Sequence, residues 1–282
     1  MKLFFRNLFI TVLFLFSTNF FFATSPAGKG IIGVNVDKKE LVKFALQKQF
    51  DGVGSIKQDG KIIASCILIA PQWCLTAAHV FDDRLKLKSV LIEINGITYK
   101  GVKKIIHNRY KKDNVDIALI YLDKAINDVE PATIYTGSNE LHSVSTFVGY
   151  GTFGTPLKPD MDIDNKDKIA GVNIIDQIGG SIPKFSNYPS HFLLEDLDNP
   201  FDTNCCNSLG SPRPLPLEYI PTGGDSGGGL FIEENGQWFL VGVFSEFEFQ
   251  LAALNKTGLY GTVAAFTRVS LFNDWIKNNL KK

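Results

Sequence analysis

The chain has 282 residues, of which 45% are apolar and 21% are charged, a balance typical of globular proteins and not of disordered ones. Its 29 basic residues equal its 29 acidic residues, so the formal net charge is zero. This balance excludes binding to nucleic acid or to an anionic membrane surface by bulk charge. The length allows about two domains or one large all-β unit.

The first predicted element is a targeting segment. Lys2 and Arg6 carry the only charges in residues 1–25, and the apolar run Leu8–Phe16 follows them. A membrane-spanning helix needs about 20 predominantly apolar residues, and Ser17–Asn19 interrupt this run. The pattern therefore predicts a cleaved signal peptide over residues 1–25. We expect a secreted or periplasmic protein with no membrane association after the leader is removed.

A short helix is predicted in the next segment, residues 26–50. Asp37 and Glu40 form a capping pattern, and Leu41 and Phe44 follow at helical spacing. We expect this helix to pack on the outside of a β core.

After residue 50 the pattern changes to short β-strands joined by tight turns. Asp59-Gly60, Asn95-Gly96 and Asn235-Gly236 each separate two strand-like runs. Such pairs accept the positive φ angles of two-residue hairpin turns. Further strand-like runs are Trp73–Thr76, Val115–Leu122, Val144–Tyr150 and Val263–Val269. Many short antiparallel strands predict a sandwich or barrels.

Two loop-rich stretches, residues 152–168 and 179–221, contain acidic runs. The first begins like a calcium loop at Asp160, but Asn165 replaces the turn glycine and Gly171 stands where the bidentate glutamate belongs. The second run has no recognised ligand spacing and consists of Glu195, Asp196, Asp198 and Asp202. We expect both runs to be solvated, and no metal or other cofactor is predicted.

The chain is predicted to end in a helix over Leu271–Leu280, with Ser270 as its cap.

The four cysteines permit three full disulfide pairings. Cys66 and Cys74 flank a predicted hairpin and are candidates for pairing across it. Adjacent Cys205 and Cys206 would pair only with strain, because a disulfide places its Cα atoms about 4.4–6.8 Å apart. Zinc binding is not predicted, because the CxxC spacing is absent.

Three short segments contain the residues of a nucleophilic mechanism: Leu75–Val80 with His79, Asp116–Leu119 with Asp116, and Gly223–Gly228 with Ser226. A serine hydroxyl is a weak nucleophile, so it needs a histidine to accept its proton and an acid to orient that histidine. Glycines around the serine leave backbone N–H groups free to stabilise an oxyanion.

The order of these segments distinguishes two families of serine hydrolases. Gly224–Gly228 also fits the G-x-S-x-G pattern of α/β-hydrolases, whose histidine follows the serine in the chain. All histidines of this chain precede Ser226, so that order is impossible. The order His79, Asp116, Ser226 is that of the chymotrypsin arrangement.

With these motifs the chain resembles the trypsin-like, chymotrypsin-fold serine endopeptidases of the exported bacterial kind, from about Asp51 to Leu280. Supporting motifs are Ile67–Trp73, Val148–Gly151, Val241–Ser245 and Phe266–Val269. The resemblance implies an all-β fold of two packed six-stranded antiparallel barrels with a C-terminal helix. The first barrel would span residues 51–140 and the second, with the helix, residues 141–282.

The same resemblance implies roles for individual residues. His79 corresponds to the general base, Asp116 to the orienting acid and Ser226 to the nucleophile. The N–H groups of Gly224 and Ser226 would form the oxyanion hole. Asp225 corresponds to the carboxylate that accepts a new N-terminal ammonium in members made as zymogens, which orders that hole.

Substrate recognition is also implied by the resemblance. Ser245 corresponds to the serine whose strand pairs with an extended substrate. Ile220 stands at the base of the primary pocket, with Phe247 and Ala264 at other pocket positions, which predicts an apolar residue before the cleaved bond. An insertion before residue 221 could shift this register and place Glu218 in the pocket instead.

The sequence leaves open whether the protein is made as a zymogen that is activated by cleavage. Ile31-Ile32-Gly33-Val34 resembles a mature N-terminus, but no basic residue directly precedes either isoleucine.

The expected partner is a protein or peptide substrate, with no nucleic acid, and a monomer is expected. The alternative is a catalytically inactive, protease-like binding or adhesion module.

Overall fold

The computed structural model describes residues 31–32, 37–81, 90–156, 158–162, 165–179, 185, 187–188, 190–210, 212–248 and 260–281. The predicted leader lies outside these residues. Within the described ranges, no helix is long and apolar enough to cross a membrane.

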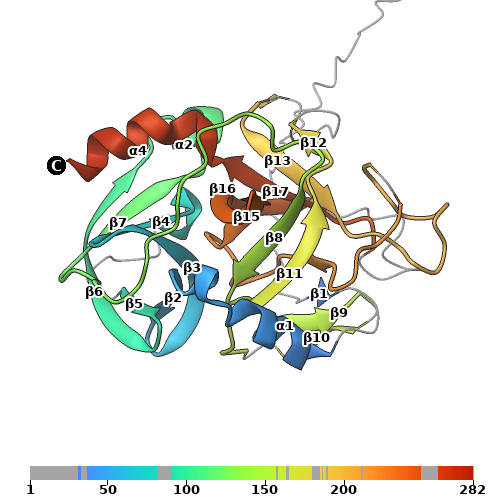
Figure 1. Cartoon of the computed structure of the whole chain (residues 1–282), viewed down its shortest axis with the longest axis horizontal. Helices are drawn as coiled ribbons and strands as arrows, with labels where there is room; N and C mark the ends of the chain where they lie inside the picture. The colour runs from blue at the N-terminus through green and yellow to red at the C-terminus, as the bar shows by residue number, and fades with distance from the viewer. Residues whose placement is uncertain are drawn as a thin grey trace, which may run out of the picture.

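A closed six-stranded barrel forms the first half of the fold, as predicted (Figure 1). Its strands follow the order β2-β3-β4-β7-β6-β5 around the barrel. They are β2 (Val53–Gln58), β3 (Lys61–Ala70), β4 (Trp73–Thr76), β5 (Leu91–Ile94), β6 (Ile97–Ile106) and β7 (Ala118–Leu122). The turns at Asp59-Gly60 and Asn95-Gly96 join β2 to β3 and β5 to β6, with φ between +50° and +77°. These turn predictions are confirmed.

Where the second six-stranded barrel was predicted, the second half is a curled half-barrel of seven strands. Its order is β11-β8-β15-β16-β17-β13-β12. The strands are β8 (Val144–Gly149), β11 (Ile169–Ile174), β12 (Gln177–Ile178), β13 (Phe192–Asp196), β15 (Gly229–Glu234), β16 (Gln237–Glu248) and β17 (Val263–Arg268). Two small antiparallel pairs lie beside it, β1 (Ile31–Ile32) with β14 (Tyr219–Ile220), and β9 (Phe153–Thr155) with β10 (Lys158–Asp162).

The two end strands of the seven-stranded order, β11 and β12, are consecutive in the chain and are separated only by residues 175 and 176. One bent segment therefore pairs with β8 through β11 and with β13 through β12, so the sheet curls back toward its own first strand. The Val172 N–H also donates to the Leu217 carbonyl at 2.9 Å, and Val172 forms a parallel bridge with Glu218.

The helices are short and lie outside the β core. They are α1 (Lys38–Ala45), η1 (Lys48–Phe50), η2 (Ala78–Phe81), α2 (Tyr110–Asp113), η4 (Val269–Phe272) and α4 (Asn273–Leu280). The Asp37 carboxylate caps α1 by accepting from the Lys39 N–H at 2.9 Å, as its capping pattern predicted. At the other end Ser270 does not cap α4, because its hydroxyl donates to the buried carboxylate of Glu140 at 2.8 Å.

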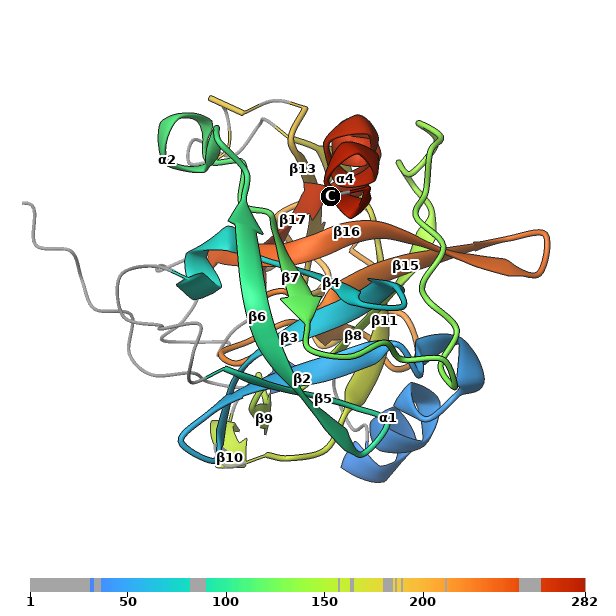
Figure 2. The same ribbon diagram turned by 90° about the vertical axis from the view of Figure 1, so that its left-hand side faces the viewer.

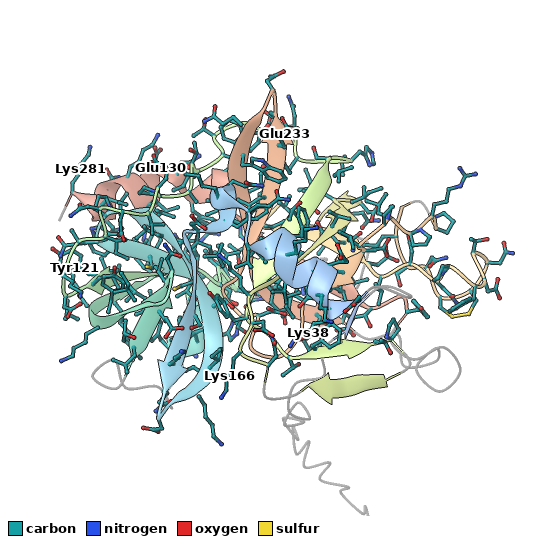
Figure 3. The ribbon with its side chains drawn as sticks, turned by 60° about the horizontal axis from the view of Figure 1, so that its bottom comes forward. Lys38, Tyr121, Glu130, Lys166, Glu233 and Lys281 are labelled. Atoms are coloured by element: carbon teal, nitrogen blue, oxygen red, sulfur yellow. A yellow bond between two sulfur atoms is a disulfide. The ribbon has the colours of Figure 1, made fainter. Side chains whose placement is uncertain are left out.

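One apolar cluster joins the two halves. Phe50 packs against Phe231 and Trp238, with ring centroids 5.4 and 5.2 Å apart. The same cluster contains Leu75 of the barrel and Ile276 of α4. Figure 2 shows α4 beside β16 and β17, and the β15–β16 hairpin extending away from the core. Glu233, near the tip of that hairpin, is at the surface in Figure 3. The two halves therefore share one apolar core.

The expectation of a solvated acidic run is wrong. Glu195 and Asp196 are buried in β13, which lies inside the sheet between β12 and β17, and Asp198 just after it is also buried, whereas Asp202 is exposed.

Of the cysteine pairings that the sequence leaves open, the structure has Cys205 bonded to Cys206, while Cys66 in β3 and Cys74 in β4 are buried free thiols.

Candidate active site

The three chemical segments lie at the ends of strands that face one another across the two halves. His79 is in η2, directly after β4. Asp116 precedes β7, which pairs with β4 along Leu75↔Leu119. Ser226 lies in the loop between β14 and β15. The barrel thus supplies His79 and Asp116, and the curled sheet supplies Ser226.

These three side chains form one continuous chain of contacts. His79 Nδ1 lies 2.6 Å from Asp116 Oδ2, and His79 Nε2 lies 2.8 Å from Ser226 Oγ. The His79 backbone N–H also donates to Asp116 Oδ1 at 2.8 Å. With its proton on Nδ1, the imidazole donates to the carboxylate and leaves Nε2 able to accept the serine proton. The arrangement suits removal of a proton from Ser226.

Asp116 is kept ionised by its surroundings. Burial raises the pKa of this carboxyl, but the His79 ring and the hydrogen bonds from His79 and Ser245 outweigh burial and lower the pKa below its ordinary value. The Ser245 hydroxyl donates to Asp116 Oδ2 at 2.6 Å, and the Thr267 hydroxyl donates to the Asp116 carbonyl at 2.9 Å. A negative Asp116 favours the imidazolium that forms when His79 takes a proton.

The loop that carries Ser226 is fastened to the barrel through Ser65. The Ser65 N–H donates to the Ser226 carbonyl at 2.8 Å, and the Ser65 hydroxyl donates to the Gly224 carbonyl at 3.2 Å. Gly227 has φ +82°, and a Cβ there would clash with Thr76 Oγ1 and the Ser65 carbonyl. Only glycine lets the loop approach the barrel this closely.

Asp225 is buried beneath this loop. Its carboxylate accepts from the Gly151 N–H at 2.7 Å, the Thr222 N–H at 2.9 Å and the Tyr219 hydroxyl at 2.6 Å. Burial raises the pKa of Asp225 to about 6, against the lowering effect of these hydrogen bonds. The carboxylate therefore points into the curled sheet and away from the solvent.

The predicted pocket residues lie together in one apolar cluster. Ile220 and Ala264 are buried in it, and the partly buried Phe247 packs against it. Phe247 pairs with Ala264 across β16 and β17, and its ring stacks on Phe244 at 6.3 Å. Glu218, the alternative pocket residue, is buried and accepts backbone hydrogen bonds from Asp198 and Leu215, at 2.7 and 2.6 Å.

Two residues of the site, Ser65 and Tyr219, were missed by sequence reasoning, and a third, Ser245, makes a contact that was not predicted. Ser65 and Tyr219 hold the Ser226 loop, and the Ser245 side chain, predicted only as part of a substrate-binding strand, binds Asp116. Neither Ser65 nor Tyr219 lies in a motif that indicates chemistry. Their roles come from contacts between segments far apart in the sequence.

The described part of the chain has no cluster of side chains that could bind a metal ion. No group of three or more His, Cys, Asp or Glu side chains there is arranged to hold a metal ion.

Comparison with known proteins agrees with this geometry. Residues 43–166 match the family model described as Trypsin, a range that contains His79 and Asp116 and ends before Ser226. This part of the chain is similar to a trypsin-like serine protease domain. The fold is the chymotrypsin fold, built here from a closed barrel and a curled seven-stranded sheet.

A curated relative matches a larger share of the chain than the family model does. The chain is 27% identical over 254 residues to Transmembrane protease serine 11G of Mus musculus. The alignment covers 79% of this chain and 51% of the mouse protein. The chain therefore spans about half the length of that relative.

Proposed function

We propose that the protein is a serine endopeptidase that hydrolyses peptide bonds through an acyl-enzyme on Ser226. One observation carries the proposal: His79 bridges Asp116 and Ser226 with contacts of 2.6 and 2.8 Å. A histidine held in this way is both a proton acceptor for the nucleophile and a proton donor for the leaving group.

The reaction would proceed in two halves. Ser226 Oγ attacks the substrate carbonyl carbon while its proton passes to His79 Nε2, and the oxyanion accepts hydrogen bonds from the Gly224 and Ser226 N–H groups. His79 then gives the proton to the leaving amine as the C–N bond breaks. In the second half, water loses a proton to His79 and attacks the acyl carbon. His79 then returns this proton to Ser226 Oγ as the acyl C–O bond breaks and the carboxylic acid leaves.

Substrate recognition is proposed to use β16 and the apolar cluster beside it. The pairing of β15 with β16 reaches Val243, just before Ser245, whose hydroxyl contacts Asp116. An extended peptide aligned with the chain at Ser245 would place its carbonyl near Ser226. The apolar side chains of Ile220, Phe247 and Ala264 favour an apolar residue before the cleaved bond.

The setting of the enzyme is part of the same proposal. The basic, apolar leader supports export to the periplasm or the medium. The zero balance of charge supports a protein or peptide substrate and not a polyanion. We propose a monomer that needs no cofactor.

The deciding experiment is labelling with a fluorophosphonate probe, which reacts with an activated serine. The wild-type protein should react and should hydrolyse casein, and Ser226→Ala should lose both activities. Ser138→Ala, at an exposed position, is the matched control and should keep both. Labelling that persists in Ser226→Ala would falsify the proposal. A wild-type protein that neither reacts nor cleaves any peptide library would favour a binding module.

A further inference from the structure

The Asp225 carboxylate is fully buried, and it accepts hydrogen bonds from backbone and side-chain groups of the protein. Oδ1 accepts from the Gly151 N–H, and Oδ2 accepts from the Thr222 N–H, the Tyr219 hydroxyl and, at 3.4 Å, the Thr222 hydroxyl. A buried carboxylate is costly unless donors compensate for the lost water. Here three residues supply four donors, and Tyr219 supplies the shortest bond, at 2.6 Å.

The position of Asp225 in the chain links these bonds to the reacting atoms. Asp225 lies between Gly224 and Ser226, whose N–H groups are the proposed oxyanion donors. A carboxylate fixed on three sides allows its own backbone little rotation, so the neighbouring N–H groups keep their direction. Such preorganised donors are worth about a hundredfold or more in kcat each.

The surroundings of Asp225 leave no room for another arrangement. A Cβ at Gly151 would clash with both carboxylate oxygens, and a Cβ at Gly149 would clash with Oδ1. The Asn165 amide donates to the Gly151 carbonyl at 2.7 Å and so holds the Gly151 N–H in place. The site is therefore shaped around the carboxylate.

Tyr219 is held as firmly as the carboxylate that it binds. It lies in β14, which pairs with β1 through Ile32↔Tyr219. Its ring stacks on Phe147 with centroids 5.7 Å apart and planes 4° from parallel. Burial raises the pKa of the Tyr219 hydroxyl well above its ordinary value, so it remains protonated and able to donate.

We infer that Tyr219 is the positioning residue that holds the catalytic loop in its working conformation in the uncleaved chain, so that activity requires no new N-terminal ammonium. The inference rests on the proposed function. In the intact chain Gly30 precedes Ile31, so the Ile31 nitrogen is a peptide nitrogen and carries no charge. The Tyr219 hydroxyl supplies a donor to Asp225 without any cleavage.

The first test is Tyr219→Phe, which removes the hydroxyl and keeps the ring. We expect kcat to fall about tenfold or more, with KM changed less than twofold, because the loss is in the oxyanion donors and not in substrate contacts. Without this donor the pKa of Asp225 rises further, and a protonated Asp225 no longer accepts hydrogen bonds at both oxygens. The acid limb of the pH profile of kcat should therefore move to higher pH.

The matched control is Tyr135→Phe. Tyr135, on the linker between the two halves, is also a buried tyrosine, and its hydroxyl donates to Glu234 at 2.8 Å. The Tyr135→Phe variant should keep the wild-type kcat and the wild-type acid limb of the pH profile. If Tyr219→Phe and Tyr135→Phe show equal kcat and equal pH profiles while both remain folded by circular dichroism, the positioning role is wrong.

The second test uses the wild-type protein and needs no variant. Intact-mass spectrometry after fluorophosphonate labelling identifies the N-terminus of each labelled molecule. Labelled chains that still contain Gly30 are expected, at the same rate as any shorter species. Labelling confined to chains that begin at Ile31 or later would overturn the inference. If no wild-type species reacts, the proposed function itself fails, which is a separate outcome.

Discussion

At the scale of single residues, Asp116 is the group whose charge has the clearest consequence. We predict that Asp116→Asn lowers kcat by about 10³–10⁴-fold at neutral pH. The neutral amide neither fixes the Nδ1–H tautomer of His79 nor stabilises its imidazolium as the carboxylate does. Steady-state hydrolysis of a chromogenic peptide, with circular dichroism to check folding, measures the effect.

Ser245→Ala is the graded companion of that substitution. It removes only one hydrogen bond to Asp116 Oδ2 and leaves the carboxylate in place. The loss of kcat should therefore be far smaller than for Asp116→Asn. Equal losses for the two variants would contradict the role assigned to the Asp116 charge.

Some residues of the site can be predicted from the sequence, and others cannot. His79, Asp116 and Ser226 lie in short segments whose composition indicates their chemistry, so the sequence predicts all three. Ser65 and Tyr219 act on the same loop, but each is ordinary in its own segment. Ser65 lies 161 residues before Ser226 in the chain, and no local sequence pattern indicates a contact between them.

At the scale of elements, the linker before β8 and the end of β17 are joined by a buried ion pair. Arg268 Nε and Nη2 donate to the two oxygens of Glu140 at 2.9 and 2.8 Å, and Ser270 donates to Oε1. Burial raises the pKa of Glu140, but these hydrogen bonds outweigh burial and keep the pKa below its ordinary value. The pair fixes the start of η4 and hence the direction of α4.

We predict that Glu140→Gln lowers the free energy of unfolding by about 2–3 kcal/mol, because it leaves the buried Arg268 charge without its counterion. Urea unfolding followed by tryptophan fluorescence measures the change. Glu130→Gln, at an exposed position on the same linker (Figure 3), is the control and should change little. A loss no larger than in the control would show that the pair contributes nothing to stability.

Elements were predicted best where one local feature decides them. The Asp-Gly and Asn-Gly turns placed three hairpins correctly, and Asp37 marked the start of α1. The start of α4 and the seventh strand of the second sheet were not predictable in this way. Ser270 turns to Glu140, and β11 and β12 pair with two different strands, β8 and β13, so both outcomes depend on partners outside the local segment.

At the scale of the whole molecule, the second half contains an unusual set of buried carboxyl groups. Burial raises the pKa of Asp196 to about 7, of Asp198 to about 8 and of Glu218 to about 7, and it raises the pKa of Glu195 well above its ordinary value. The sequence predicted a solvated run here, because composition alone does not reveal that β13 lies between two other strands. Glu195 Oε2 and Asp198 Oδ1 are buried without a described hydrogen-bond partner.

These raised pKa values predict a protein that is more stable in mild acid than at alkaline pH. In the unfolded chain the same carboxyls titrate near their ordinary values of about 4. A group whose pKa is raised by folding contributes stability below its unfolded pKa, and the contribution is lost as the pH rises through the folded value. The loss should therefore extend from about pH 4 to about pH 8. Asp116 and Glu140, whose pKa values are lowered, lose their contribution only in stronger acid.

We expect the melting temperature to be higher at pH 5 than at pH 8 by on the order of 5 °C, measured by differential scanning calorimetry in buffers of equal ionic strength. Glu195→Gln replaces one buried carboxyl with a group that cannot ionise, so the difference between the two pH values should shrink. Glu130→Gln, at the surface, should keep the full difference. A melting temperature that is equal at the two pH values, or higher at pH 8, would mean that these carboxyls are ionised in the folded protein and that their charge is compensated inside the sheet.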